Sequence, residues 1–238
     1  LYQSTVAGRQ SPAASRQSPA ASRRSPAAGR RSPAASRQAS GETVNCPVML
    51  LNPFSRRDDA HPLAVGMTGV SMGDGLLQIG CAHGGRLGAI AGKVGLSGRA
   101  VAVVPDEASA ARARKGAAQA GVLVEIEVAP PTRLPVDDAG FDVAIVDDTG
   151  GFAGSMPAEN RKAMVDEIFR ALRPGGRVIV IGATPGGGLS ALLRPSSGPL
   201  FVASGDANAG LTAGSFKPVR TLAAREGLVF VEGIKPRQ

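Results

Sequence analysis

The chain has 238 residues and two cysteines, 19% of its residues are charged, and its formal net charge is +8. This length suits one α/β domain with a tail and is enough to bury a sizeable core. A strongly positive chain often has a nucleic-acid or anionic-membrane partner. Here seven arginines and one acid lie in residues 1–48, so this segment carries a net +6 and residues 49–238 carry only +2. The charge therefore gives no reason to expect specific nucleic-acid binding by a folded domain.

Residues 10–37 are four copies of a seven-residue unit, Gln/Arg-Ser-Pro-Ala-Ala-Ser/Gly-Arg. Each copy has a proline and no other apolar side chain larger than alanine, which excludes a heptad coiled coil or a packed repeat. We predict a disordered low-complexity tail over residues 1–48 and a folded domain over residues 49–238. Our preferred interpretation is that the tail is an over-extended reading frame, because Met49 precedes the first globular-looking sequence. A solvated tail and an organelle transit peptide are the alternatives, and the repeated proline argues against the second.

The cysteines and the hydropathy pattern limit where the protein can work. Cys46 and Cys81 give no disulfide framework, which fits a reducing cytoplasm. No apolar run approaches the roughly 18 residues that a membrane span needs. We therefore expect a soluble, cytoplasmic protein without a membrane partner, and the sequence predicts no oligomeric state.

Hydrophobic periodicity predicts helices and strands along the folded part. In chain order we expect a helix over 61–69, a strand over 76–79, a helix over 86–94, a strand over 100–104, a helix that Asp106 caps and Gly121 ends, strands over 122–128 and 141–146, a helix over 157–172, a strand over 177–181, a short helix over 207–213, and strands over 218–222 and 229–234. Residues 183–208 are rich in glycine, serine and proline and are predicted to be a long loop.

The alternation of strands and helices indicates a parallel, doubly wound sheet that is covered on both faces. The last two strands are spaced as a hairpin, so they would add an antiparallel pair to the five strands before them. We therefore predict an α/β fold with a mostly parallel seven-stranded sheet and a C-terminal β-hairpin.

Residues 76–85 are the stretch around which the domain is organised, because a buried strand runs through a small-residue loop directly into an amphipathic helix. Glycine in such a loop lets a ligand approach the backbone, and the free amides of the following helix favour negative charge. The site suits a nucleotide or nucleoside. By spacing alone, the loop fits an imperfect dinucleotide fingerprint and an imperfect S-adenosylmethionine loop equally well.

Three blocks separate these two alternatives. They read GDGLLQIGCAHG at 73–84, LPVDDAGFDV at 134–143 and EIFRALRPGGRV at 167–178. Over residues 69–182 the chain resembles the class I S-adenosylmethionine-dependent methyltransferases, in particular the broad small-molecule type that includes quinone C-methyltransferases. The terminal hairpin is likewise typical of that family, and nicotinamide dehydrogenases usually lack it.

The resemblance implies S-adenosylmethionine as cofactor, a small-molecule acceptor and a Rossmann-like methyltransferase fold. It also implies a set of cofactor-binding residues, which are Gln78, Gly80, Cys81, Ala82, His83, Gly84, Val104, Pro105, Asp106, Thr132, Arg133 and Asp147. Asp147 and Asp148 are the catalytic candidates, because the end of the fourth strand faces the transferred methyl group in this fold and a carboxylate there can take a proton from an acceptor. No third acid or histidine follows at a ligand spacing, so no metal site is predicted.

The chain departs from the family at three positions where an acid is usual, which here are Gln78, Val104 and Pro130. A carboxylate on the two ribose hydroxyls contributes about 1.5–3 kcal/mol, so valine at the end of the second strand predicts weaker donor binding. Our prediction is a methyltransferase for a small molecule with an atypical donor site. The alternative is a methyltransferase-like domain that is catalytically inactive and acts as a binding or scaffold protein.

Overall fold

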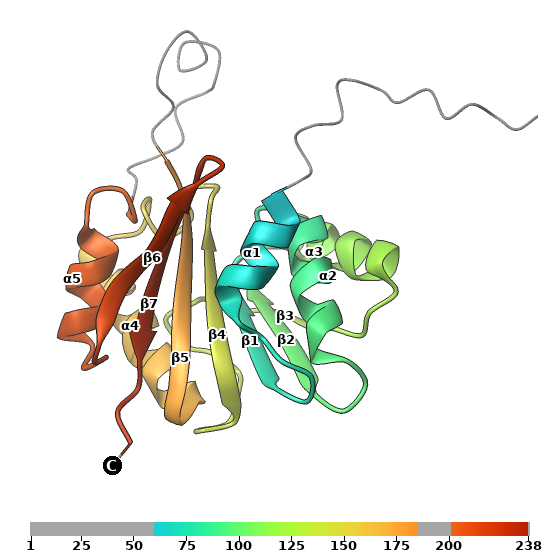
Figure 1. Cartoon of the computed structure of the whole chain (residues 1–238), viewed down its shortest axis with the longest axis horizontal. Helices are drawn as coiled ribbons and strands as arrows, with labels where there is room; N and C mark the ends of the chain where they lie inside the picture. Colours follow the sequence, from blue (N-terminus) through green and yellow to red (C-terminus); the bar gives the residue numbers. More distant parts are fainter. Residues whose placement is uncertain (1–59, 185–200, 238) are drawn as a thin grey trace, which may run out of the picture. The chain divides into compact units, whose positions relative to one another are not determined.

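The computed structural model describes residues 60–184 and 201–237. The described residues form an α/β domain (Figure 1). Its elements are α1 (Ala60–Thr68), β1 (Gly75–Ile79), α2 (Gly84–Val94), β2 (Arg99–Val104), α3 (Glu107–Ala120), β3 (Glu125–Val128), β4 (Phe141–Asp148), α4 (Ala158–Ala171), β5 (Leu172–Ala183), α5 (Asp206–Ala213), β6 (Val219–Arg225) and β7 (Leu228–Ile234).

The seven strands form one sheet in the order β3-β2-β1-β4-β5-β7-β6. The pairs from β3 to β5 are all parallel, whereas β7 pairs antiparallel with both β5 and β6. This arrangement confirms the predicted doubly wound sheet with its C-terminal hairpin. The order reverses between β1 and β4, and open α/β sheets bind ligands at such a reversal, beyond the carboxyl ends of the strands.

Alternate side chains of each strand face opposite layers of helices. In β4, Val143 and Ile145 belong to the core cluster that contains residues of α1 and α2, whereas Ala144 and Val146 belong to the cluster that contains residues of α4 and α5. Figure 1 shows the same division, with α1, α2 and α3 grouped over β1, β2 and β3 and with α4 on the other face of the sheet. Asp147 and Asp148 continue this alternation at the end of β4, so their side chains leave the sheet on opposite faces.

Several elements differ from the predicted bounds, among them β4 and β6, which end two and three residues later than predicted. β3 begins at Glu125 rather than at residue 122, because the Val122 amide donates to the Ala117 carbonyl and so ends α3, together with the left-handed Gly121. α2 begins at Gly84, two residues before the predicted start. β5 begins at Leu172, five residues before the predicted start. The Gly175 amide, which was expected in a turn, donates to the Lys235 carbonyl.

Several predictions concern residues that the structure does not describe. The repeat tail at 1–48 lies outside the described residues, as does most of the predicted loop at 183–208. Within residues 60–184 and 201–237, none of the helices combines the length and the apolar character needed to cross a membrane.

Candidate active site

A cavity of about 190 Å³ lies at the carboxyl ends of β1, β2 and β4. We call it the cleft. Its position at the reversal of strand order is the one that the fold predicts for a ligand site. Residues from all three strand ends or from the segments that follow them line it, namely Gly80, Cys81, Ala82, Pro105, Asp106, Ser109, Arg112, Asp147, Gly150 and Phe152. Since β1 lies between β2 and β4, the cleft has a β2 side and a β4 side, separated by the glycine loop.

Gly80 begins the loop with a φ of +76°, a conformation that favours glycine. Its amide donates to the Val103 carbonyl at 2.9 Å, which holds the loop against the end of β2. A β-carbon at this position would lie 3.2 Å from Cδ1 of Phe152 and 3.3 Å from the Asp147 carbonyl oxygen. Both the backbone and the close neighbours therefore require glycine here.

Asp147 is buried and fully engaged by neighbouring groups. Its Oδ1 atom accepts from Arg86 Nη1 at 2.8 Å and from Thr149 Oγ1 at 2.7 Å, and its Oδ2 atom accepts from the Ala82 amide at 3.1 Å. The side chains of Arg86 and Asp147 are only 6% and 1% exposed, so their charges neutralise each other with little solvent screening. Asp147 thus joins the glycine loop and the first turn of α2 to the end of β4.

Asp148 faces the opposite side of the sheet and does not line the cleft. Its Oδ1 atom accepts from the Ala153 amide at 2.6 Å and from the Gly154 amide at 3.2 Å, so it fixes the segment after β4. Burial raises the pKa of the Asp148 carboxyl to about 6, although the two amides act in the other direction. A carboxyl with this pKa can exchange a proton near neutral pH, but its hydrogen bonds point to residues 153 and 154 rather than to the cleft.

Gln78 occupies the position before the loop where the family usually has an acid. It is 1% exposed, and its Nε2 atom donates to the Gly80 carbonyl at 3.1 Å. Its Oε1 atom has no hydrogen-bond partner in the part of the chain that the structure describes. A buried amide oxygen of this kind is costly, and a donor group of a ligand would satisfy it.

The β2 side of the cleft is polar, although Val104 contributes nothing to it. Val104 is fully buried in a cluster with Leu87 and Ala110. Asp106 caps α3 as predicted, with its Oδ1 atom accepting from the Ser109 amide at 2.7 Å. Arg112 donates from Nη2 to Ser109 Oγ at 2.7 Å and from Nε to the Cys81 carbonyl at 3.2 Å.

Four lining residues were missed by sequence reasoning: Ser109, Gly150, Phe152 and Arg112. Ser109 lies three residues after Asp106 in the predicted helix, so helical spacing could have placed Ser109 near the cap. Arg112 lies six residues after Asp106. Phe152 lies in an irregular segment, where no periodicity indicates which way a side chain points.

Several predicted site residues do not line the cleft. His83 is the N-terminal boundary residue of α2, makes no side-chain cap bond, and lies with its ring centroid 6.4 Å from that of His61. Gly84 faces α3, because a β-carbon there would clash with the Arg112 carbonyl. The packing of the two helices therefore requires glycine here, and the contact of Gly84 with a ligand stays a prediction. Thr132 lies in a turn after β3 and is not among the residues that line the cleft.

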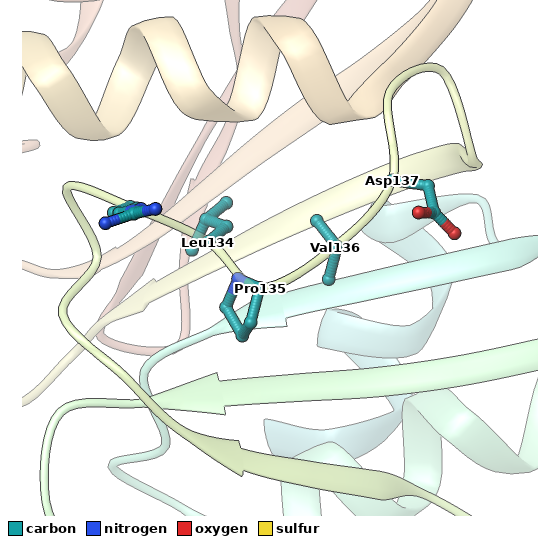
Figure 2. Close-up of a pocket in the computed structure, with 5 residues that line it drawn as sticks. Leu134, Pro135, Val136 and Asp137 are labelled. Carbon is teal, nitrogen blue, oxygen red and sulfur yellow. The ribbon is translucent and has the colours of Figure 1, made fainter.

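Arg133 lines a different hollow, of about 540 Å³, with residues 134–137 (Figure 2). Figure 2 shows Leu134, Pro135, Val136 and Asp137 placed along the segment that connects β3 with β4. Another hollow, of about 700 Å³, is lined by residues of α1, of α2 and of the turn at 69–71. Both exceed the cleft in volume, but neither lies at the strand ends where the fold places ligands.

Cys81 is a titratable group in the glycine loop. Burial raises the pKa of its thiol to about 11, and the neighbouring Asp147 carboxylate adds to the effect. The thiol is therefore neutral and weakly nucleophilic at physiological pH. Within the described ranges, no three or more His, Cys, Asp or Glu side chains gather closely enough to hold a metal ion.

Comparison of the sequence with known proteins gives a family match over the segment that contains the loop and β4. Residues 76–176, which include most of β1, the loop and the start of β5, match the family described as a methyltransferase domain. Uncharacterized proteins of Mycobacterium bovis and Mycobacterium tuberculosis are 31% identical to the chain over 123 residues. That match covers 52% of this chain and 42% of each relative, so the chain aligns with less than half the length of these curated relatives.

Comparisons of structure identify the fold. A SAM-dependent methyltransferase from Aquifex aeolicus aligns with a TM-score of 0.56 at 17% identity, over 75% of this chain and 95% of that one. The [4+2]-cyclase SpnF aligns with a TM-score of 0.55 at 17% identity, over 76% of this chain and 81% of that one. PigF with SAH aligns with a TM-score of 0.51 at 19% identity, over 68% and 50%.

The cyclase shows that this fold supports more than one reaction, so the fold by itself does not assign an activity. The family match is more specific, because it covers the loop, the end of β4 and the start of β5 in one alignment. Residues 76–176 thus match a methyltransferase domain, and the fold of the described residues is the one seen in solved S-adenosylmethionine-dependent methyltransferases.

Proposed function

We propose that the protein is an S-adenosylmethionine-dependent methyltransferase that acts on a small-molecule acceptor and has an atypical donor site. The observation that carries this proposal is the cleft, because it brings the glycine loop, the β2 side and the β4 side together where the fold places a nucleoside. The lack of a carboxylate at the end of β2 favours the catalytically inactive alternative. That alternative does not explain the family match or the cleft.

The residues present fit a nucleoside donor. Gly80 and Ala82 offer backbone without a bulky side chain, and Gln78 has a buried oxygen that needs a hydrogen-bond donor. On the β2 side Asp106, Ser109 and Arg112 offer polar groups in place of the usual strand-end acid. The cleft is smaller than the roughly 300–1,000 Å³ of typical small-molecule pockets, so a bound donor would extend beyond it.

S-adenosylmethionine, when bound, supplies an electrophilic methyl group whose transfer needs alignment and exclusion of water more than acid–base help. The proposed role of Asp147 is accordingly to hold the loop in place, since Arg86, Thr149 and Ala82 already occupy its oxygens. Asp148 is the proposed proton acceptor of the pair, because its pKa of about 6 suits a base near neutral pH. That role requires residues 153 and 154 to release the carboxylate and the Asp148 side chain, which faces away from the cleft, to turn toward it.

Titration calorimetry of the full chain with S-adenosylmethionine and with S-adenosylhomocysteine tests the donor part of the proposal. We expect both to bind, and to bind about ten- to a hundredfold more weakly than if a carboxylate held the ribose. Absence of binding by both ligands would favour the scaffold alternative.

The acceptor part needs a separate experiment. With a methyl-labelled donor, we expect label to enter organic-extractable small molecules, tested as a panel of phenols, quinols and carboxylic acids. Labelling of added protein or nucleic acid, with none of the panel labelled, would contradict the small-molecule assignment.

A further inference from the structure

Phe152 is a lining residue of the cleft to which neither the family match nor the proposed function gives a role. It lies in the segment between β4 and α4 and is half-buried. Its Cδ1 and Cε1 atoms lie 3.2 and 3.5 Å from the position of a β-carbon on Gly80. The ring is thus in contact with the first glycine of the loop, on the β4 side of the cleft.

The backbone around Phe152 is held by four hydrogen bonds. The Ala153 and Gly154 amides donate to Asp148, the Gly151 amide donates to the Asp148 carbonyl at 2.9 Å, and Ser155 Oγ donates to the Phe152 carbonyl at 3.0 Å. The ring also packs against the core cluster of α4 and α5. The ring is therefore preorganised beside the loop rather than free to sample many positions.

The charges on this side of the cleft are already balanced. Asp147 is paired with Arg86, so the two contribute no net charge, and Gly150 has no side chain. On the β2 side, the positive charge of Arg112 lies near the negative charge of Asp106. Among the described residues that line the β4 side, Phe152 therefore has the side chain that can attract a cation and is not already paired with another charge.

The electron-rich ring of phenylalanine attracts a cation that packs against it. We propose that Phe152 packs against the sulfonium of the donor and makes the cleft prefer the methylated, cationic donor to the neutral thioether product. This inference rests on the proposed function, because it needs the methionine end of the donor to lie over Gly80. It concerns the charge of the ligand, since donor and product differ by one methyl group and one positive charge.

The test measures the affinity of the full chain for S-adenosylmethionine and for S-adenosylhomocysteine by calorimetry and compares the ratio of the two between variants. Phe152→Leu removes the ring and keeps an apolar side chain, whereas Phe152→Tyr keeps the ring. We expect the preference for S-adenosylmethionine to fall about two- to thirtyfold in Phe152→Leu and to change less than about twofold in Phe152→Tyr. Phe152→Met is a second replacement without a ring, should the leucine variant not fold.

Phe169→Leu is the matched control, because Phe169 packs against the ring of Phe216 at a centroid distance of 5.2 Å and does not line the cleft. It should lower the melting temperature without changing the affinity ratio. An equal loss of affinity for both ligands in Phe152→Leu would show that the ring acts by shape alone and would overturn the inference. Tighter binding of both ligands would show that the ring obstructs the cleft and would also overturn it. If the wild-type chain binds neither ligand, the proposed function itself fails, which separates the two conclusions.

Discussion

Val104 shows how packing changes the meaning of a missing functional residue. The family resemblance alone predicts that Val104→Asp supplies a ribose-binding carboxylate and tightens donor binding about tenfold. In the structure the side chain is fully buried among Leu87, Ala110 and Ala113. A carboxylate there would be desolvated without a partner, so we expect a loss of about 1–3 kcal/mol in stability and no gain in affinity for S-adenosylhomocysteine.

Melting temperature and calorimetry on this one variant decide between the two outcomes. Val104→Asn is the uncharged control of similar size, and it should be destabilised less than the aspartate. A stable Val104→Asp variant with tighter binding would contradict the packing argument and support the family pattern.

Asp148 should make stability depend on pH in a recognisable direction. Its pKa is about 6 in the folded chain and 3.8 in the reference state, so the folded chain holds a proton there that the unfolded chain has lost. Asp148 therefore favours folding below about pH 4, and this contribution is lost as the pH rises through 6. The wild type should therefore lose stability relative to Asp148→Asn between pH 4 and pH 7, by about 1–3 kcal/mol. We expect the melting temperature of Asp148→Asn minus that of the wild type to increase over this range. Parallel curves for the two proteins would contradict the raised pKa.

At the scale of the elements, the contact between α2 and α3 depends on glycines. A β-carbon on Gly84 would clash with the Arg112 carbonyl, and one on Gly116 would clash with the backbone of Gly84. We expect Gly84→Ala and Gly116→Ala to force the helices apart and to lower stability by about 1–3 kcal/mol, with weaker donor binding as the loop shifts. Gly92→Ala in the same helix is the control, because its β-carbon would lie 3.7 Å from Val122 in ordinary contact, and it should be neutral or stabilising. A tolerated Gly84→Ala would show that α3 can move away without cost.

The order of the elements was predictable from the sequence because each one has a local signal. Asp106 and Gly121 mark the ends of α3, and the apolar run from Phe141 predicts β4. Positions that depend on distant partners were not predictable. The role of Asp147 is set by Arg86, 61 residues earlier, and the role of Gly84 is set by a neighbouring helix. Spacing therefore identified the loop and the strand ends, but it did not show which side chains face the cleft.

At the scale of the whole molecule, the repeat at residues 10–37 predicts that the tail contributes nothing to folding stability, since it offers almost no apolar surface to bury. We expect a chain that starts at Met49 to have the same melting temperature as the full chain. Limited proteolysis of the full chain should cut first between Arg9 and Arg37. A drop of several degrees on removal of residues 1–48 would refute this prediction, because it would mean that the tail packs on the domain.

The ion pair between Arg86 and Asp147 has a consequence for the history of the sequence. Either residue alone would leave a buried charge without a partner, at a cost of about 3–5 kcal/mol, so a change at one position is tolerated only with a change at the other. Positions 86 and 147 should therefore covary when homologous sequences are aligned. We expect relatives that lack arginine at the first position to carry a neutral residue at the second, and frequent relatives with only one of the two charges would contradict the coupling.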